Sequence, residues 1–153
     1  MDQQKLKHFI RRYEEVYLFA MKRVNSIISE KVLEELTIEQ YQVLRYITGR
    51  EKCRSTELAE VCGVNKSAIT AMIDRLVLKG FVERTRDEED RRGVFLTSSP
   101  KGKEVFEKGE QQIQQFVASY LTVLTEEEID TFLSVYEKIY KMTQGKYEEE
   151  EAP

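Results

Sequence analysis

The spacing of apolar residues changes at Gly80, and this change constrains the fold more than any other feature of the sequence. Before Gly80, the stretch VNKSAITAMIDRLVLKG carries apolar side chains at helical spacing, which places them in one stripe: Ile69, Met72, Ile73 and Leu76. After Gly80, FVERTR alternates between the two faces of a strand and GVFLT is rich in strand-forming residues. We therefore expect a helix that ends at Gly80, followed by a β-hairpin whose turn is the charged stretch between these two segments.

Helical signals precede this stretch. Apolar residues recur at three- and four-residue steps over residues 5–29, which predicts a long amphipathic helix. Thr37 and Gln40 form a capping box that opens a helix to about Thr48. STELAEVCG begins with two hydroxyl residues able to cap, Ser55 and Thr56, and closes on Gly63, so it predicts a helix of barely two turns.

Two more helices are expected after the hairpin. Ser99 and Pro100 suit the N-cap and first position of one helix, and Thr125 with Glu128 forms a capping box for the last. The predicted fold class is mainly α with a small β-hairpin. A short helix, a tight turn, a longer helix and a two-stranded ribbon form a winged helix-turn-helix, whose second helix can enter a DNA major groove.

Net charge does not decide between partners for this chain. The formal net charge is −4, but residues 1–36 and 37–100 each carry +1, and residues 101–153 carry −6. The acidity therefore belongs to the C-terminal third, and the charged face matters more than the sum. No apolar run is long enough for a membrane span and the N-terminus has no signal-peptide pattern, so we expect a cytoplasmic protein without a membrane partner.

The expected second helix of the motif has a face suited to DNA. With the apolar stripe turned inward, Ser67, Ala71 and Asp74 face outward, flanked by Ala68, Thr70 and Arg75. Small side chains allow close approach to base edges, and Lys66 with the first-turn N–H groups suits a phosphate. Asn65 is a candidate cap for the same helix. The alternative is an ordinary surface face with small polar residues.

The expected hairpin turn gathers positive charge at its tip. Its arginines are Arg84, Arg86, Arg91 and Arg92. Arginines on such a tip can reach a narrow minor groove, where negative potential concentrates. The Asp90 carboxylate is placed to hold the guanidinium of Arg92 or of Arg75, whereas Glu88 and Glu89 would repel phosphate. A solvated charged hairpin is the alternative.

Residues 80–102, GFVERTRDEEDRRGVFLTSSPKG, resemble the wing signature of the multiple antibiotic resistance regulator (MarR) family of bacterial transcription factors. The shared elements are Gly80, Arg84, the Asp90-Arg91-Arg92 cluster, the Leu96-Thr97 pair and Gly102. The stretch STELAEVCGVNKSAITAMIDRLVLKGFVER is similar to the two preceding helices of the family, and the flanking helices fit its dimerisation region.

The resemblance implies a homodimer built from residues 3–30 and 101–142 that binds a pseudo-palindromic operator in double-stranded DNA and represses nearby genes. The helix from Lys66 would lie in the major groove and Arg92 in the minor groove. The implied DNA-binding residues are Ser55, Thr56, Asn65, Lys66, Ser67, Ala68, Thr70, Ala71, Arg75, Arg84, Arg86, Asp90, Arg91 and Arg92. The implied regions are a dimerisation helix (1–36), a winged helix-turn-helix (37–100), C-terminal dimerisation helices (101–145) and an acidic tail (146–153).

Relatives in this family often bind small aromatic acids, which implies a possible effector. Aromatic residues that would line its pocket are Tyr13, Tyr17, Tyr41, Phe116 and Tyr120. The alternative is that aromatic residues at helical spacing are core. One branch of the family senses peroxide through a cysteine in the first helix, which this sequence lacks.

The cysteines leave a redox-responsive regulator as an alternative function. Cys53 lies beside Lys52 and Arg54, which would lower its pKa, and Cys62 is expected to be a small buried residue at a helix end. Zinc and iron-sulfur spacings are missing from the sequence, so no metal or cofactor is expected. With one histidine and no glycine-rich phosphate loop, an enzyme is not expected. A winged-helix module that binds protein is the remaining alternative.

Overall fold

The computed structural model describes residues 1–90 and 93–144. Helices and strands follow in this order: α1 (Gln3–Tyr13), η1 (Glu14–Leu18), α2 (Phe19–Ile27), η2 (Ile28–Val32), α3 (Ile38–Thr48), α4 (Ser55–Cys62), α5 (Lys66–Leu78), β1 (Val82–Arg86), β2 (Val94–Ser98), α6 (Pro100–Leu121) and α7 (Glu126–Thr143). The chain divides into two compact units, Met1–Gln114 and the part from Gln115 onward, so α6 crosses from one to the other. The order confirms the predicted fold class, mainly α with one hairpin.

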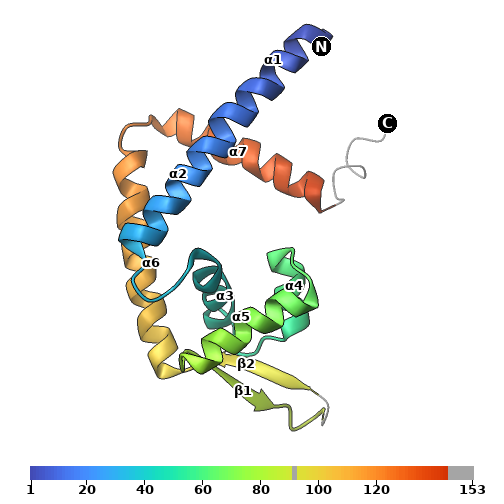
Figure 1. The fold of residues 1–153 in the computed structure, drawn as a ribbon, viewed down its shortest axis with the longest axis vertical. Coiled ribbons are helices and arrows are strands. Elements are labelled where there is room, and N and C mark those ends of the chain that lie inside the picture. The colour runs from blue at the N-terminus through green and yellow to red at the C-terminus, as the bar shows by residue number, and fades with distance from the viewer. Residues whose placement is uncertain (91–92, 145–153) are drawn as a thin grey trace. The chain divides into compact units, whose positions relative to one another are not determined.

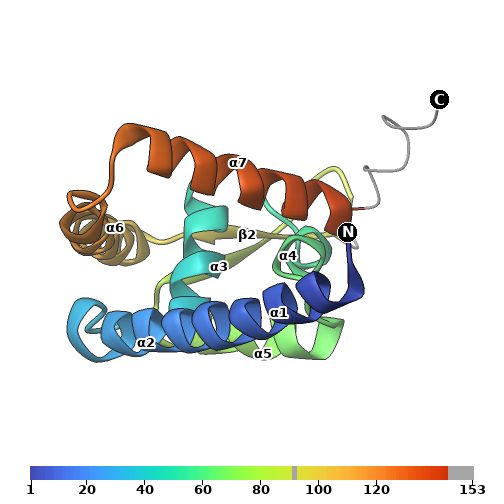
Figure 2. The ribbon, with the colours of Figure 1, turned by 90° about the horizontal axis from the view of Figure 1, so that it is seen from above.

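The four N-terminal helical segments, α1, η1, α2 and η2, form one continuous helical rod, as Figures 1 and 2 show. The sequence predicts a helix over residues 5–29, and the rod extends from Gln3 to Val32. Two of its segments, η1 and η2, are π-helical, with the wider i to i+5 hydrogen bonding seen where the Leu33 N–H donates to the Ile28 carbonyl at 2.9 Å. The apolar pattern carries no signal for these wider turns.

The hydrophobic core lies in the first unit, where α3, α4, α5 and the hairpin meet. Helix α3 contributes Leu44 and Ile47, which have no exposed surface, and α4 contributes Leu58, which is buried to the same degree. The α5 stripe is buried as predicted at Ile69, Ile73 and Leu76, while Met72 is partly buried against the same cluster. Phe106 on α6 closes the core by stacking on Tyr41, with ring centroids 5.8 Å apart.

Caps define the ends of these helices. Both predicted capping boxes are present, because Thr37 accepts from the Gln40 N–H and Thr125 accepts from the Glu128 N–H. Asn65 caps α5 as predicted, its Oδ1 accepting from the Ala68 N–H at 2.8 Å. Ser99 Oγ accepts from the Gly102 N–H at 2.9 Å, which confirms the predicted start of α6.

The start of α4 corrects one expectation. Ser55 and Thr56 do not cap this helix; they are its first two residues, and Arg54 holds the N-cap position without a side-chain cap bond. The end of α4 is as predicted, because Gly63 adopts a φ of 62°, a left-handed conformation that glycine reaches without a Cβ clash.

The hairpin pairs β1 and β2 antiparallel, with Val82 opposite Ser98 and Arg86 opposite Val94. A bridge outside the two strands joins Leu96 to Cys53, where the Leu96 N–H donates to the Cys53 carbonyl at 2.8 Å. The segment before α4 therefore runs along the outer edge of β2. This contact brings residue 54 close to the hairpin turn.

The second unit contains the end of α6 and all of α7, and none of the α7 residues is buried. Across the described part of the chain, no helix is both long and apolar enough to cross a membrane. The predicted acidic tail at 146–153 lies outside the described residues, and the predicted boundaries at 36, 100 and 145 stay predictions.

Candidate nucleic-acid interface

Helix α5 turns a face of small polar residues away from the core. Ser67, Ala71 and Asp74 are exposed, as the helical wheel predicts. Their flanking residues Thr70 and Arg75 are exposed too, and Ala68 is half-buried. No side chain longer than Asp74 stands in the middle of this face. An approaching surface can therefore come close to the α5 backbone.

The N-terminal turn of α5 presents a cation beside the helix end. Lys66, its first residue, is exposed and forms no ion pair among the residues the structure describes. The Thr70 hydroxyl donates to the Lys66 carbonyl at 2.7 Å, so this hydroxyl is oriented along the helix. The positive end of the helix dipole and Lys66 together favour an anion at this turn.

A small cavity brings three predicted site residues together. Ser55 from α4, Thr70 from α5 and Arg84 from β1 line an open pocket of about 210 Å³, together with Ile73, Val94 and Leu96. Ser55, Thr70 and Arg84 therefore belong to one continuous surface that α4, α5 and the hairpin share. Thr56, the neighbour of Ser55, is exposed on the first turn of α4.

An ion pair fixes the hairpin to α5. The Arg84 guanidinium donates to the Asp74 carboxylate on the outward face of the helix. This pair neutralises Arg84, one of the predicted DNA-binding cations. Its guanidinium instead holds β1 against α5. Within the described residues, Arg75 and Arg86 form no ion pair, so they remain the available guanidinium groups of the α5 face and the strand.

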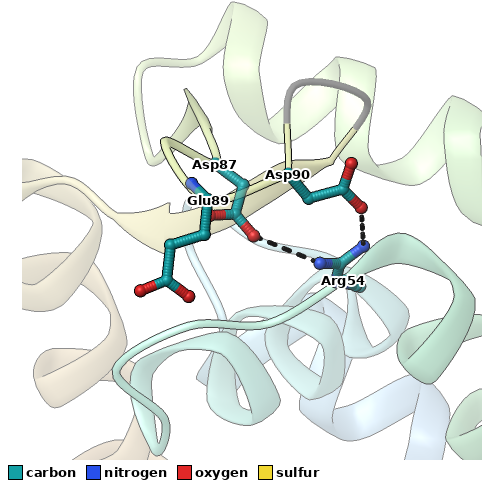
Figure 3. A network of polar contacts seen from close by, with 4 residues as sticks. All are labelled: Arg54, Asp87, Glu89 and Asp90. Carbon is teal, nitrogen blue, oxygen red and sulfur yellow. Dashed lines mark hydrogen bonds and ion pairs between the residues drawn. The ribbon is translucent and has the colours of Figure 1, made fainter.

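The turn of the hairpin is held by a residue that sequence reasoning missed. This residue is Arg54, which precedes Asp87 by 33 positions. Arg54 Nη2 donates to Asp87 Oδ2 at 3.2 Å, and Arg54 Nη1 lies 4.0 Å from Asp90 Oδ2 (Figure 3). Asp90 was expected to hold Arg92 or Arg75. The structure places Asp90 near Arg54, and Arg75 forms no ion pair among the described residues. Arg91 and Arg92 lie outside the described residues, so the pairing of Asp90 with Arg92 stays a prediction.

Comparisons with known proteins identify the family. The sequence model of the MarR family matches residues 36–94. The multiple antibiotic resistance protein MarR of Salmonella typhimurium is 34% identical over 106 residues, which cover 69% of this chain and 74% of the relative. This chain belongs to the MarR family. Members of this family are transcriptional regulators, which agrees with the expectation that this chain is not an enzyme.

Two further comparisons support the fold and the family. The transcriptional repressor MdtR of Bacillus subtilis is 35% identical over 94 residues, 61% of each chain. A crystal structure of a mutant MarR from E. coli complexed with operator DNA matches with a TM-score of 0.75 and 28% identity, over 85% of this chain and 94% of that one. The winged helix-turn-helix predicted from the sequence is therefore confirmed.

The aromatic residues proposed for an effector pocket contact other aromatic rings within their own unit of this MarR-family chain. Tyr13 and Tyr17 stack on the helical rod with centroids 5.0 Å apart, and Phe116 and Tyr120 meet edge to face at 5.7 Å. Tyr41 is a core residue that stacks on Phe106. For Tyr41, the core alternative is correct, and the pocket itself stays a prediction.

The expected activation of Cys53 is wrong. Cys53 is only 1% exposed, and burial, helped by the nearby Glu57 carboxylate, raises its pKa to about 11. The neighbouring basic residues point away from the thiol, because the Arg54 guanidinium extends to the hairpin turn and Lys52 lies over the Phe95 ring. Cys62 is half-buried at the end of α4, and burial raises its pKa as well. Neither thiol has the depressed pKa typical of a redox sensor.

Proposed function

We propose that this chain is a homodimeric repressor that binds a pseudo-palindromic DNA operator through α5 and the hairpin. The observation that supports it best is the continuous surface in which the α5 face, the first turn of α4 and the hairpin meet. Lys66 and Arg75, beside small side chains on α5, and Arg86 at the end of β1 form no ion pair among the residues that the structure describes. The operator complex of the similar E. coli protein supports the same use of the fold.

The exposed apolar residues of the terminal helices support the homodimer. On α1, Phe9 is 51% and Ile10 47% exposed, and on α7, Phe132 is 54% and Leu133 51% exposed. Neither helix has a buried residue in the single chain. Contiguous apolar residues left exposed on a helix mark an interaction surface. Two copies would also present two α5 helices, as a symmetric operator requires.

We further propose that the chain represses transcription and that a small aromatic ligand releases it from DNA. The name of the similar MdtR protein supports repression. The exposed Tyr13 and its stacked partner Tyr17 supply aromatic surface for such a ligand. A regulator needs access to the chromosome, so the cytoplasm remains its expected location.

Binding to duplexes selected from a genomic pool tests this proposal. We expect a pseudo-palindrome with half-sites about 10 base pairs apart, bound by one dimer. Arg86→Ala and Lys66→Ala should each weaken binding and reduce the slope of log K against log salt by about 1, because each removes one phosphate contact. Arg92→Ala should weaken it as well.

Lys22→Ala is the matched control, because Lys22 is an exposed cation on the helical rod. Its affinity and salt slope should equal those of the wild type. Failure of the wild-type protein to prefer any duplex over random DNA would overturn the proposed function. Binding without a preference but with strong salt dependence would leave only a nonspecific DNA-binding role.

A further inference from the structure

We propose that Arg54 is a positioning residue for the hairpin turn, which holds two carboxylates away from DNA and keeps the turn aligned with α5. This inference rests on the proposed function, because it concerns how the same surface meets DNA. Arg54 belongs neither to α5 nor to the hairpin. Its role is assigned from the contacts of its guanidinium with the residues on either side of the turn.

Arg54 occupies a position where a different residue would serve the helix better. It is the N-cap of α4, where Ser, Thr, Asp and Asn are preferred because their short side chains accept a hydrogen bond from the first turn. Arginine cannot accept such a bond, and α4 has no side-chain cap. The side chain extends to the hairpin turn instead, so this position serves a tertiary contact at the expense of the cap.

The guanidinium binds both ends of the acidic stretch that follows β1. Nη2 donates to Asp87 Oδ2 at 3.2 Å, and Nη1 lies 4.0 Å from Asp90 Oδ2 (Figure 3). The Asp87 side chain is only 10% exposed, whereas that of Arg54 is 41% exposed. A carboxylate so well covered loses most of its hydration, which makes its ionic partner more important than at an open surface.

The backbone at Gly93 and the ring of Phe95 also contact the Arg54 guanidinium. A Cβ on Gly93 would lie 3.2 Å from both Nη atoms of Arg54, so the guanidinium lies against the chain at a point where a side chain would crowd it. The Arg54 Cζ lies 5.1 Å from the centroid of the Phe95 ring, within range of a cation–π contact. A planar group that spans two carboxylates and contacts a ring is specific to arginine, and a lysine ammonium cannot replace it.

Asp87 transmits this hold to the turn. The Glu89 N–H donates to Asp87 Oδ1 at 3.0 Å, while the opposite oxygen of Asp87 faces Arg54. The turn is closed by the Asp87 N–H, which donates to the Gly93 carbonyl at 2.9 Å, and by the Gly93 N–H, which donates to the Asp90 carbonyl at 2.8 Å. Movement of the Asp87 carboxylate would break the bond from the Glu89 N–H and loosen the turn that the two backbone bonds close.

The charge of the turn explains why this hold matters for DNA binding. Four acidic residues, Asp87, Glu88, Glu89 and Asp90, lie between the strands and would repel phosphate. Arg54 pairs with the first and the last of them. Without its guanidinium, both carboxylates would lose a cationic partner, and the turn would become more negative.

The first test compares operator binding by Arg54→Ala, Arg54→Lys and the wild-type protein. We expect about a tenfold loss of affinity for both variants, typical of a lost charge-assisted hydrogen bond, with an unchanged salt slope because no phosphate contact is removed. Adding Asp87→Asn and Asp90→Asn to Arg54→Ala should restore part of the affinity, since these changes remove the repulsion. A salt slope reduced as far as in Arg86→Ala, without rescue, would show a direct phosphate contact and overturn the proposal.

The second test needs no DNA. Amide hydrogen exchange at Asp87 and Gly93 should become about tenfold faster in Arg54→Ala, because the turn hydrogen bonds open more often. Arg50→Ala is the matched control, because Arg50 is a nearby arginine whose guanidinium lies 3.4 Å over the Tyr46 ring. Unchanged exchange in Arg54→Ala would refute the positioning role. If the wild-type protein bound no operator, the proposed function would fail, while the exchange rates would still decide whether Arg54 holds the turn.

Discussion

The winged core and the terminal helices differ in how far they complete their own packing. In the core, Leu44, Ile47 and Leu58 on α3 and α4 have no exposed surface. In contrast, α1 and α7 have no buried residue, although each carries apolar side chains at helical spacing. The same amphipathic pattern is therefore satisfied within the chain in one region and left open in the other.

This difference separates two roles of hydrophobic patterning. A stripe that finds a partner in its own chain stabilises the fold of the monomer, because burial removes apolar surface from water. A stripe without such a partner predicts that a second molecule covers it. We expect core substitutions to act on unfolding, and substitutions on α7 to act on association.

Leu44→Ala should have the largest effect on stability. It removes a fully buried side chain from the centre of α3 and leaves a cavity, so the free energy of unfolding should fall by about 2–5 kcal/mol. Leu78→Ala is the matched control, because Leu78 is 88% exposed at the end of α5 and should change stability by less than about 0.5 kcal/mol. Urea unfolding at one protein concentration measures both, and equal effects would contradict the division into a closed core and open helices.

Leu133→Glu should break the association of two chains. It places a charge in the exposed apolar stripe of α7, and burying that charge at an interface should raise the dimer dissociation constant by about 100-fold. Ser134→Glu adds the same charge to the opposite face of the helix and should leave the dimer intact. Light scattering across a dilution series distinguishes them. A wild-type chain that stays monomeric would refute the dimer.

Local signals predicted the fold well. The capping boxes at Thr37 and Thr125 and the Asn65 cap depend on residues within four positions of each other, and the change of pattern after Gly80 depends on short stretches on either side of it. Hydrogen-bond partners that close in sequence can be identified without a structure. For this reason, the starts of α3, α5 and α7 and the location of the hairpin could be stated in advance.

Contacts between distant residues could not be predicted in the same way. Arg54 and Asp87 are 33 positions apart, and nothing near Arg54 signals that its side chain extends to the hairpin turn. The pairing of Arg84 with Asp74 depends on how β1 packs on α5, which periodicity does not specify. Residues on a helical face were thus predictable, whereas the ion pairs that fix the hairpin required the tertiary structure.

The titration of Cys53 should have the smallest effect on stability, and it tests whether this residue belongs to the core that excludes water. Sequence neighbours suggested a low pKa, but burial raises its pKa to about 11, above its ordinary value. Because the unfolded chain releases this proton at lower pH than the folded chain, the free energy of unfolding should fall as pH rises from about 8.5 towards 11.

At pH 9.5 this loss should reach about 1 kcal/mol relative to pH 7.5, beyond the loss shown by Cys53→Ala, in which the titrating group is absent. Urea unfolding of both proteins at each pH separates the cysteine from other groups that titrate there. Parallel pH profiles for the two proteins would show that the thiol titrates normally. The segment before α4 would then open to water. In that case Cys53, which forms a bridge with Leu96, would not belong to the core that excludes water.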